Sequence, residues 1–291
     1  MCAGRDMAMR VALCQLQILF EKKEENTRRV LHFMEQARSA GADLVLFPEM
    51  SLTGFSMNIA LTGEKNRESV ELMCAAAKRI GVAVGFGWTA FAGDHEAPDH
   101  VSDGNCDIPG DARGENHYTI ISAQGELLSD YVKMHPFSYS GEDRCFAKGN
   151  RTAHFTLEGI PFSHFICYDL RFPEIFQAVS GRAHVIIVAA DWPGSRREHW
   201  KCLLRARAIE NQCYILGVNT VGSQNGLNYT GDSCVILPDG TVAAQLPDEE
   251  GLLVYDLADD VQDYRSAFPV KQDRREELYV RLTGSEKDRT W

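Results

Sequence analysis

The sequence is short of positive charge and contains no local run of lysine and arginine. Its 291 residues include 30 Lys and Arg against 41 Asp and Glu, which gives a formal net charge of -11. Such a chain repels polyphosphate, so nucleic-acid binding loses its main electrostatic contribution. The charge balance therefore favours a small-molecule partner and excludes nucleic acid.

Long hydrophobic runs are also missing. No stretch approaches the roughly 20 apolar residues that a membrane-spanning helix needs. An N-terminal apolar run from Val11 to Phe20 is interrupted by Gln15 and Gln17, and it lacks the small-residue cleavage site of a secretory signal. We therefore interpret this run as a first core strand, and we expect a protein that does not associate with membranes and stays in the cytoplasm.

Metal-binding patterns are absent from the sequence. The nine cysteines and nine histidines form no CxxC pair, no HExxH motif and no cluster with metal-ligand spacing. We expect neither a metal nor any other cofactor. Buried cysteine commonly behaves as a small apolar residue. That role is predicted for Cys14, Cys74, Cys202, Cys213 and Cys234.

Hydrophobic periodicity alternates between strand and helix along the chain. Between Lys22 and Ala40, apolar residues recur at spacings of three and four, which indicates a helix with one buried face. Gly41 follows the last periodic residue, where a left-handed helix end suits glycine. The same reasoning predicts strands at 11–16, 44–47, 82–87, 118–122, 127–132, 162–167, 184–189, 214–219, 233–237, 241–245 and 251–256, and helices at 69–80, 172–179 and 198–211.

This alternation predicts a single α/β domain with mixed sheets over residues 1–291. Strand-helix-strand units give parallel strands, whereas the hairpin at 118–132 gives antiparallel ones. A polar C-terminal arm is expected from about residue 258. Residues 94–116 contain few apolar residues and many turn formers, so they are predicted to be a surface insertion. A lid over the site and a plain surface loop both remain open for this segment.

Cys167 is the candidate nucleophile. It is the last residue of a predicted apolar strand and precedes a predicted helix in the segment FICYDLRFPE. Backbone N–H groups at such a turn, together with the positive end of the following helix, favour a thiolate and a developing oxyanion. From this segment alone, Cys167 could also be another buried structural thiol.

Two further strand ends carry groups that complement a thiol. Glu49 follows an apolar strand in FPEMSLTGF, and Lys133 follows the predicted strand 127–132 in YVKMHPF. A thiol that attacks an amide needs a base to take its proton and return it to the departing ammonia, and the tetrahedral intermediate needs a cation. Glu49 and Lys133 could supply these functions. His135 remains a rival base, because sequence spacing does not exclude a cysteine-histidine pair.

Taken together, Glu49, Lys133 and Cys167 resemble the Glu-Lys-Cys triad of the nitrilase superfamily of carbon-nitrogen hydrolases, in the usual chain order. The resemblance covers nearly the whole chain apart from the first nine residues and the segment 94–116. It implies an α-β-β-α sandwich. It also implies that subunits dimerise through outer helices and C-terminal arms, so we expect a homodimer.

The resemblance assigns roles to three further residues. Glu142, nine positions after Lys133, is similar to the second glutamate of the family, which orients the lysine and helps to position the substrate. The backbone N–H of Tyr168 would complete an oxyanion hole with Lys133. Phe55, in the same motif as Glu49, is expected to border the substrate.

Within the superfamily, Asp191-Trp192-Pro193 followed by Arg196, His199 and Trp200, together with ARAIEN and TGDS, resembles ω-amidases. These enzymes hydrolyse the terminal amide of 2-oxoglutaramate and 2-oxosuccinamate. A dicarboxylic monoamide needs a cation for its distal carboxylate, and Arg196 is the candidate because a guanidinium binds carboxylate through two parallel hydrogen bonds. An ordinary surface ion pair is the alternative for Arg196. Trp192 would provide an apolar wall. One departure is Asp191, where that branch commonly has asparagine.

The sequence therefore predicts an amidase that forms a Cys167 thioester and releases ammonia. Nitrile hydrolysis through a thioimidate would use the same three residues, and an ammonia-supplying amidase with a separate synthetase partner also remains open. A non-catalytic homologue is the alternative outside enzymes, but it is expected to have lost a member of the triad. All three members are present in this chain.

Overall fold

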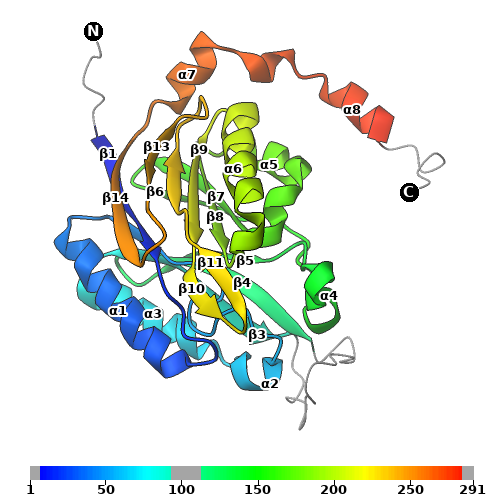
Figure 1. Ribbon diagram of the computed structural model, residues 1–291. Coiled ribbons are helices and arrows are strands. Elements are labelled where there is room, and N and C mark those ends of the chain that lie inside the picture. Colours follow the sequence, from blue (N-terminus) through cyan, green and yellow to red (C-terminus); the bar gives the residue numbers. More distant parts are fainter. Residues whose placement is uncertain (1–6, 93–112, 284–291) are drawn as a thin grey trace.

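The computed structural model describes residues 7–92 and 113–283. Two six-stranded sheets face each other at the centre of the molecule (Figure 1). Each sheet contains parallel and antiparallel neighbours, as the sequence predicts. A separate two-stranded hairpin is formed by β10 (Val221–Gln224) and β11 (Leu227–Thr230).

The first sheet carries Glu49 and Lys133 at its strand ends. Its parallel centre is followed by the antiparallel pair β4 and β5, which confirms the predicted hairpin. In spatial order its strands are β14 (Gly251–Ala258), β1 (Met7–Gln15), β2 (Leu44–Leu46), β3 (Ala83–Phe91), β4 (Gly114–Ile121) and β5 (Leu127–Val132).

The second sheet carries Cys167. Three parallel strands form its centre, and antiparallel strands flank them on both sides. In spatial order its strands are β13 (Val242–Gln245), β12 (Cys234–Ile236), β9 (Tyr214–Asn219), β8 (Val185–Ala190), β7 (Ile160–Ile166) and β6 (His154–Leu157).

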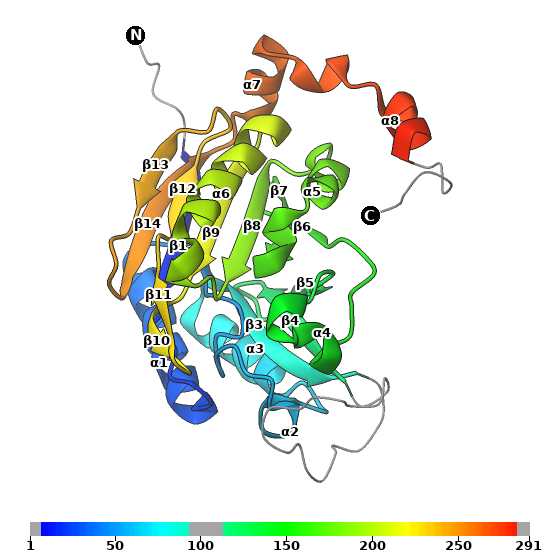
Figure 2. The ribbon, with the colours of Figure 1, turned by 45° about the vertical axis from the view of Figure 1, so that its right-hand side comes forward.

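Helices cover the outer face of each sheet. The first sheet is covered by α1 (Lys23–Ser39) and α3 (Glu68–Ile80), and the second by α5 (Pro173–Ser180) and α6 (Arg197–Asn211) (Figure 2). Gly81 ends α3 with φ 77°, a left-handed conformation that glycine adopts without a Cβ clash. The layers are therefore helix, sheet, sheet and helix, which confirms the predicted sandwich.

Side-chain alternation along β1 divides the core into layers. Val11 and Leu13 belong to the cluster between the sheets, whereas Ala12 and Cys14 belong to the cluster under α1 and α3. Residues of a strand point alternately to opposite faces, so one apolar strand contributes to both layers. Both layers are fully buried at these positions, which fixes the register of the strand on which the site depends.

Some elements differ from the sequence prediction. Strands β6, β10 and β11, each of four residues and partly exposed, were not predicted. Most of the predicted insertion, residues 93–112, lies outside the described residues, but its last residues belong to β4, and Asn116 is buried. Among the cysteines expected to be buried, Cys202 is exposed and Cys74 half-buried, because both lie on outer helix surfaces.

The C-terminal arm leaves the sandwich after β14. Helices α7 (Val261–Ala267) and α8 (Glu276–Thr283) extend away from the body of the molecule (Figure 1). Arg265 in α7 anchors the start of the arm, donating to the backbone carbonyls of Ser180, Ala183 and Gln212 at 2.9, 3.0 and 3.0 Å. None of the helices in the described part of the chain has the length and apolar character to cross a membrane.

Candidate active site

The three residues of the predicted triad lie close together, although they are far apart in the sequence. Glu49 follows β2, Lys133 follows β5 and Cys167 follows β7. The carboxyl ends of parallel strands lie at one edge of a sheet. Because the two sheets pack face to face, these edges of the two sheets lie next to each other. The fold therefore brings a carboxylate, an ammonium and a thiol into one buried site.

Glu49 is held by a tight approach between two backbone segments. A Cβ at Gly87 of β3 would overlap the backbone N of Met50, so only glycine permits β3 to pass this close. Met50 itself has φ 41°, a strained left-handed conformation. The Asp191 N–H donates to Glu49 Oε2 at 3.0 Å, which ties Glu49 to the end of β8 in the opposite sheet.

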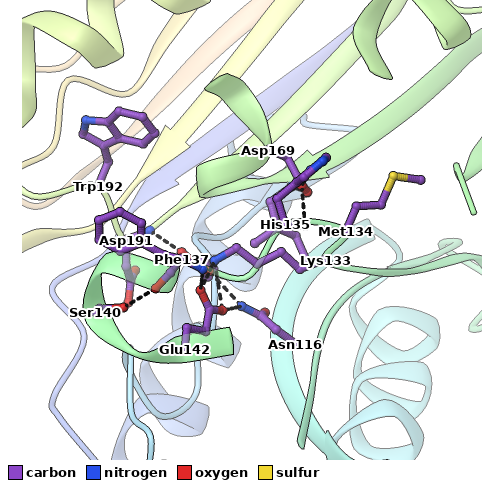
Figure 3. A network of polar contacts seen from close by, with 12 residues as sticks. Asn116, Lys133, Met134, His135, Phe137, Ser140, Glu142, Asp169, Asp191 and Trp192 are labelled. Atoms are coloured by element: carbon purple, nitrogen blue, oxygen red, sulfur yellow. Dashed lines mark hydrogen bonds and ion pairs between the residues drawn. The ribbon is translucent and has the colours of Figure 1, made fainter. Parts of the chain in front are cut away.

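Lys133 lies between two carboxylates and is fully buried. Its Nζ donates to Glu49 Oε1 at 2.7 Å and to the two oxygens of Glu142 at 3.0 and 2.8 Å (Figure 3). Burial alone would lower the pKa of Lys133, but the Glu142 and Glu49 carboxylates outweigh burial and raise this pKa well above its usual value. The lysine is therefore a permanent cation beside the thiol.

Glu142 begins the short helix α4 (Glu142–Cys145) and is completely buried. Besides Lys133, its Oε2 accepts a hydrogen bond from the backbone N–H of Phe137 at 2.5 Å. These contacts restrict the carboxylate from two sides. They fit the lysine-orienting role that the sequence resemblance implies for this glutamate.

Asn116 completes this polar cluster and was missed by the sequence reasoning. Its Nδ2 donates to Glu49 Oε1 at 2.8 Å and to Glu142 Oε1 at 3.1 Å (Figure 3). It was assigned to the surface insertion because polar and turn-forming residues precede it. The signal that could have found it is its place two residues before the apolar run at Tyr118.

Cys167 stands at a strained turn. Its φ of 47° lies in the left-handed region, which is costly for a residue with a side chain. It is the first residue of the 3₁₀ turn η3 (Cys167–Arg171), whose early N–H groups lack partners within the turn. The turn therefore exposes the thiol and the following N–H of Tyr168 at the carboxyl end of β7.

Asp169 holds this turn against the lysine segment. Its Oδ2 accepts from the Tyr131 hydroxyl at 2.7 Å and from the Ile166 N–H at 3.2 Å, while Oδ1 accepts from the His135 N–H at 3.0 Å. Tyr131 and His135 flank Lys133 in sequence. One fully buried carboxylate thus links the nucleophile turn to the loop that carries the cation.

The expectation that the turn stabilises a Cys167 thiolate is wrong for the ligand-free protein. Burial of the thiol and the nearby Glu49 carboxylate raise the pKa of Cys167 well above its usual value, and the Lys133 ammonium only partly opposes them. The thiol is therefore neutral before substrate binds. A base must remove its proton during the reaction.

His135 does not join the thiol cluster. Its Nδ1 lies 2.8 Å from Asp169 Oδ1, and its ring stacks on Phe172 with 3.8 Å between centroids. The contact with Asp169 is drawn apart from the contacts that converge on Lys133 (Figure 3). The Glu49 carboxylate acts on Cys167, whereas the imidazole of His135 is not among the groups that do.

A cavity of about 330 Å³ opens above Cys167. Its lining includes Phe55, Tyr168, Trp192 and Arg196, which the sequence placed near the substrate, whereas Glu142 lies outside the lining. The ring of Phe55 also lies 5.4 Å from Lys133 Nζ. The remaining lining residues are Phe137, Tyr139, Ser140, Cys167, Arg171, Asp191, Pro193, Ser195, Leu227 and Tyr229.

Two arginines face this cavity. The guanidinium of Arg196 lies 5.1 Å from the ring centre of Phe137, and that of Arg171 lies 4.8 Å from the ring centre of Trp192. Burial and then the nearby charge of Arg196 lower the pKa of Arg171, whereas Tyr168 raises it. Sequence reasoning missed Arg171 because it follows the nucleophile in a segment interpreted as a helix start.

The fold and the site define a class of protein: an α-β-β-α sandwich whose joined sheet ends hold a thiol, two carboxylates and an ammonium above a small cavity. Among the described residues, no three or more His, Cys, Asp or Glu side chains cluster as a metal site would require. The chain belongs to the carbon-nitrogen hydrolase family, whose model matches residues 10–266. It is therefore an enzyme of that family.

Curated relatives agree with this class. A 2-oxoglutaramate amidase from Bacillus subtilis is 32% identical over 94% of this chain and 100% of its own length. The omega-amidase YafV from Escherichia coli is 29% identical over 92% of this chain and 97% of its own length. Both alignments extend well beyond the motifs around Glu49, Lys133 and Cys167.

Solved structures share the fold. A mutant of an amidase from Nesterenkonia sp. AN1 superposes with a TM-score of 0.79 and 25% identity, covering 96% of this chain and 98% of that one. That structure shows covalent addition of the acetamide moiety of fluoroacetamide at the active-site cysteine of the Nesterenkonia protein.

Proposed function

We propose that this enzyme hydrolyses a small-molecule amide through a thioester on Cys167, with Glu49 as general base and acid. The observation that supports this most directly is the buried cluster in which Lys133 Nζ lies 2.7 Å from Glu49 and 2.8 Å from Glu142, beside a thiol that lines the cavity. The cysteine adduct in the Nesterenkonia amidase supports the choice of nucleophile.

The first half of the reaction forms the thioester. Glu49 takes the proton of the Cys167 thiol as the sulfur attacks the amide carbon, and the carbonyl oxygen becomes negative. Glu49 then gives this proton to the nitrogen, the carbon-nitrogen bond breaks and ammonia leaves. Because burial and the Glu49 carboxylate raise the pKa of the free thiol, a base must remove its proton for the sulfur to attack.

The second half releases the acid. A water molecule gives a proton to Glu49 and attacks the thioester carbon. The carbon-sulfur bond then breaks, and the proton returns from Glu49 to the sulfur of Cys167. In both halves the negative oxygen is stabilised by the Lys133 ammonium and the backbone N–H of Tyr168, while Glu142 holds the lysine in place.

We further propose that the substrate is the ω-amide of a 2-oxo dicarboxylic acid. A protein of net charge -11 can bind such an anion only where positive charge is concentrated. Arg171 and Arg196 both face the cavity that contains Cys167, and Trp192 and Phe55 provide apolar walls. The names of the Bacillus and Escherichia relatives support the same substrate class.

Replacing Arg196 by alanine is expected to raise the KM for 2-oxoglutaramate by about tenfold to a hundredfold, because a charged hydrogen bond to the distal carboxylate is lost. The KM for an uncharged amide of equal length should change little. Steady-state ammonia release, measured with both substrates, checks this expectation. Arg182→Ala, which removes an exposed arginine, is the matched control.

An unchanged preference in Arg196→Ala would remove Arg196 from the binding site. A wild-type preference for the neutral amide would contradict the ω-amide proposal itself. Adding small nitriles to the same panel separates amide hydrolysis from nitrile hydrolysis, since both would proceed through Cys167.

We also propose that the chain acts as a homodimer in which the C-terminal arm is covered by the partner subunit. Large apolar side chains of the arm are exposed in the single chain, including Phe268 at 60% and Leu282 at 67%. Exposed apolar groups concentrated on an extended segment are typical of a contact surface. The described contacts of the arm with the sandwich are polar, such as those of Arg265 with the Ser180 and Ala183 carbonyls and of Arg274 with the Gln177 side chain, and they leave these apolar groups exposed.

A double substitution Phe268→Glu and Leu282→Glu is expected to convert the dimer into a monomer, because each buries a charge in the proposed interface. Sedimentation velocity measures the mass of the species in solution. The control is Leu61→Glu, which changes a side chain that is 59% exposed on α2 (Ile59–Thr62), away from the arm. A wild-type protein that sediments as a monomer would contradict the proposal.

A further inference from the structure

Asp191 is a buried carboxyl group beside Glu49 and Lys133. It follows β8, lines the cavity above Cys167 and is only 4% exposed. Its backbone N–H is used by Glu49, but neither of its carboxyl oxygens makes a hydrogen bond of normal geometry to a described residue. Buried polar atoms nearly always have a hydrogen-bond partner, so the two carboxyl oxygens of Asp191 are unusual.

The surrounding charges disfavour ionisation of Asp191. Lys133 already serves Glu49 and Glu142, and its three N–H donors match the three contacts with these carboxylate oxygens. The buried cluster therefore holds two carboxylates and one ammonium. Ionisation of Asp191 would add a further negative charge beside Glu49, and Lys133 has no N–H left to donate to it.

Burial and the nearby charges also favour the protonated form of the Asp191 carboxyl. Burial, and next the Glu49 carboxylate, raise the pKa of Asp191 well above its usual value. Lys133 and the backbone N–H of Phe55 oppose this shift more weakly. The titratable or charged groups that act on Asp191, or share its cavity, are Glu49, Lys133, Cys167, Tyr229, Arg171 and Arg196.

We propose that Asp191 is a specificity-determining residue, which in its neutral form donates its O–H to an oxygen of the anionic amide substrate. The inference rests on the proposed function for the chemical class of the substrate. A neutral acid offers a donor close to Cys167 without repelling the carboxylate that the two arginines attract. The group left without a partner in the free protein gains one when substrate binds.

This arrangement makes anion binding sensitive to pH. Below the pKa of Asp191 the acid is neutral and can donate. As pH rises through that pKa, the carboxyl loses its proton, becomes an acceptor only and adds a negative charge to the cavity. Affinity for an anion therefore falls with rising pH. Asparagine at this position would keep a donor but carry no titrating charge.

Binding of 2-oxoglutarate, the acid that the proposed reaction would release, tests the inference without turnover. Calorimetry is performed on the full chain carrying Cys167→Ala, which removes the thiol from the titration, and on the same protein with Asp191→Asn or Asp191→Leu. We expect the affinity of the parent to fall by tenfold or more as pH rises. The Asp191→Asn protein should lack that fall, and Asp191→Leu should bind about tenfold more weakly at low pH.

The same pH dependence in the parent and in Asp191→Asn, or undiminished binding by Asp191→Leu, would overturn the proposal. A second measurement reports the proton directly. In the ligand-free protein labelled with ¹³C-aspartate, the carboxyl resonance that Asp191→Asn removes should titrate at higher pH than the exposed aspartates. Titration together with the exposed aspartates would also overturn it.

These outcomes are separate from those for the proposed function. If ω-amides are not hydrolysed while anion binding still depends on the Asp191 proton, the substrate assignment fails and the role of Asp191 as a neutral donor stands. If ω-amides are hydrolysed and the binding profile is independent of Asp191, only the present inference fails.

Discussion

Replacing Cys167 by alanine is expected to reduce amide turnover by a factor of about 10⁴ or more, because no other group can form the thioester and removal of a nucleophile abolishes the covalent route. The fold should persist, since the change from thiol to methyl removes little volume from a largely buried position. Ammonia release, circular dichroism and thermal unfolding together check both parts of this expectation.

The other cysteines provide the control for this prediction. Cys202 is exposed and free, so Cys202→Ala should retain full activity. Iodoacetamide should inactivate the wild type by modifying Cys167, and a substrate analogue that fills the cavity should slow the inactivation. Retained turnover in Cys167→Ala, or inactivation that follows modification of a different cysteine, would show that the nucleophile is assigned wrongly.

Replacing Glu49 by glutamine is expected to lower kcat by about a hundredfold or more, because a positioned general base commonly contributes that much. The neutral thiol of Cys167 makes the dependence strong, since its proton must be removed before attack is complete. Glutamine can still accept from the backbone N–H of Asp191, so the loop should keep its position. Single-turnover measurements of acylation and deacylation would show whether both halves are slowed.

His135→Gln is the matched control, because it changes the rival base and the contact of its ring with Asp169. We expect this variant to retain most of the turnover that Glu49→Gln loses. Near-normal turnover in Glu49→Gln together with an inactive His135→Gln would move the base to His135. That pair of results would also require a rearrangement of the stacked ring on Phe172.

The sequence by itself determined most helices and strands and the identity of the main reactive groups, whereas the layered sandwich was implied by the family resemblance. Apolar periodicity predicted α1 and α3 to within a residue or two, and Gly41 and Gly81 marked their ends, because helix amphipathicity and left-handed caps are local properties. The placement of Glu49, Lys133 and Cys167 directly after apolar strands is local as well. Their motifs could therefore be found without coordinates.

Only the tertiary structure decided what surrounds these groups. The contacts of Glu49 with Lys133, Asn116 and Asp191 span 84, 67 and 142 residues of sequence. Such partners are chosen by how the two sheets face each other, and no local pattern records that choice. For the same reason Asn116 was interpreted as part of a surface loop, although it is buried against Glu49 and Glu142.

The fold likewise decided the protonation states of Cys167 and Asp191. The position of Cys167 before a turn suggested a thiolate, but burial beside Glu49 keeps the thiol protonated. Asp191 stood in the sequence as one substitution in a recognisable segment, and its unpaired carboxyl became visible only with its neighbours in place. Burial and neighbouring charge depend on the complete three-dimensional surroundings, so the protonation states of this site are properties of the fold rather than of any single motif.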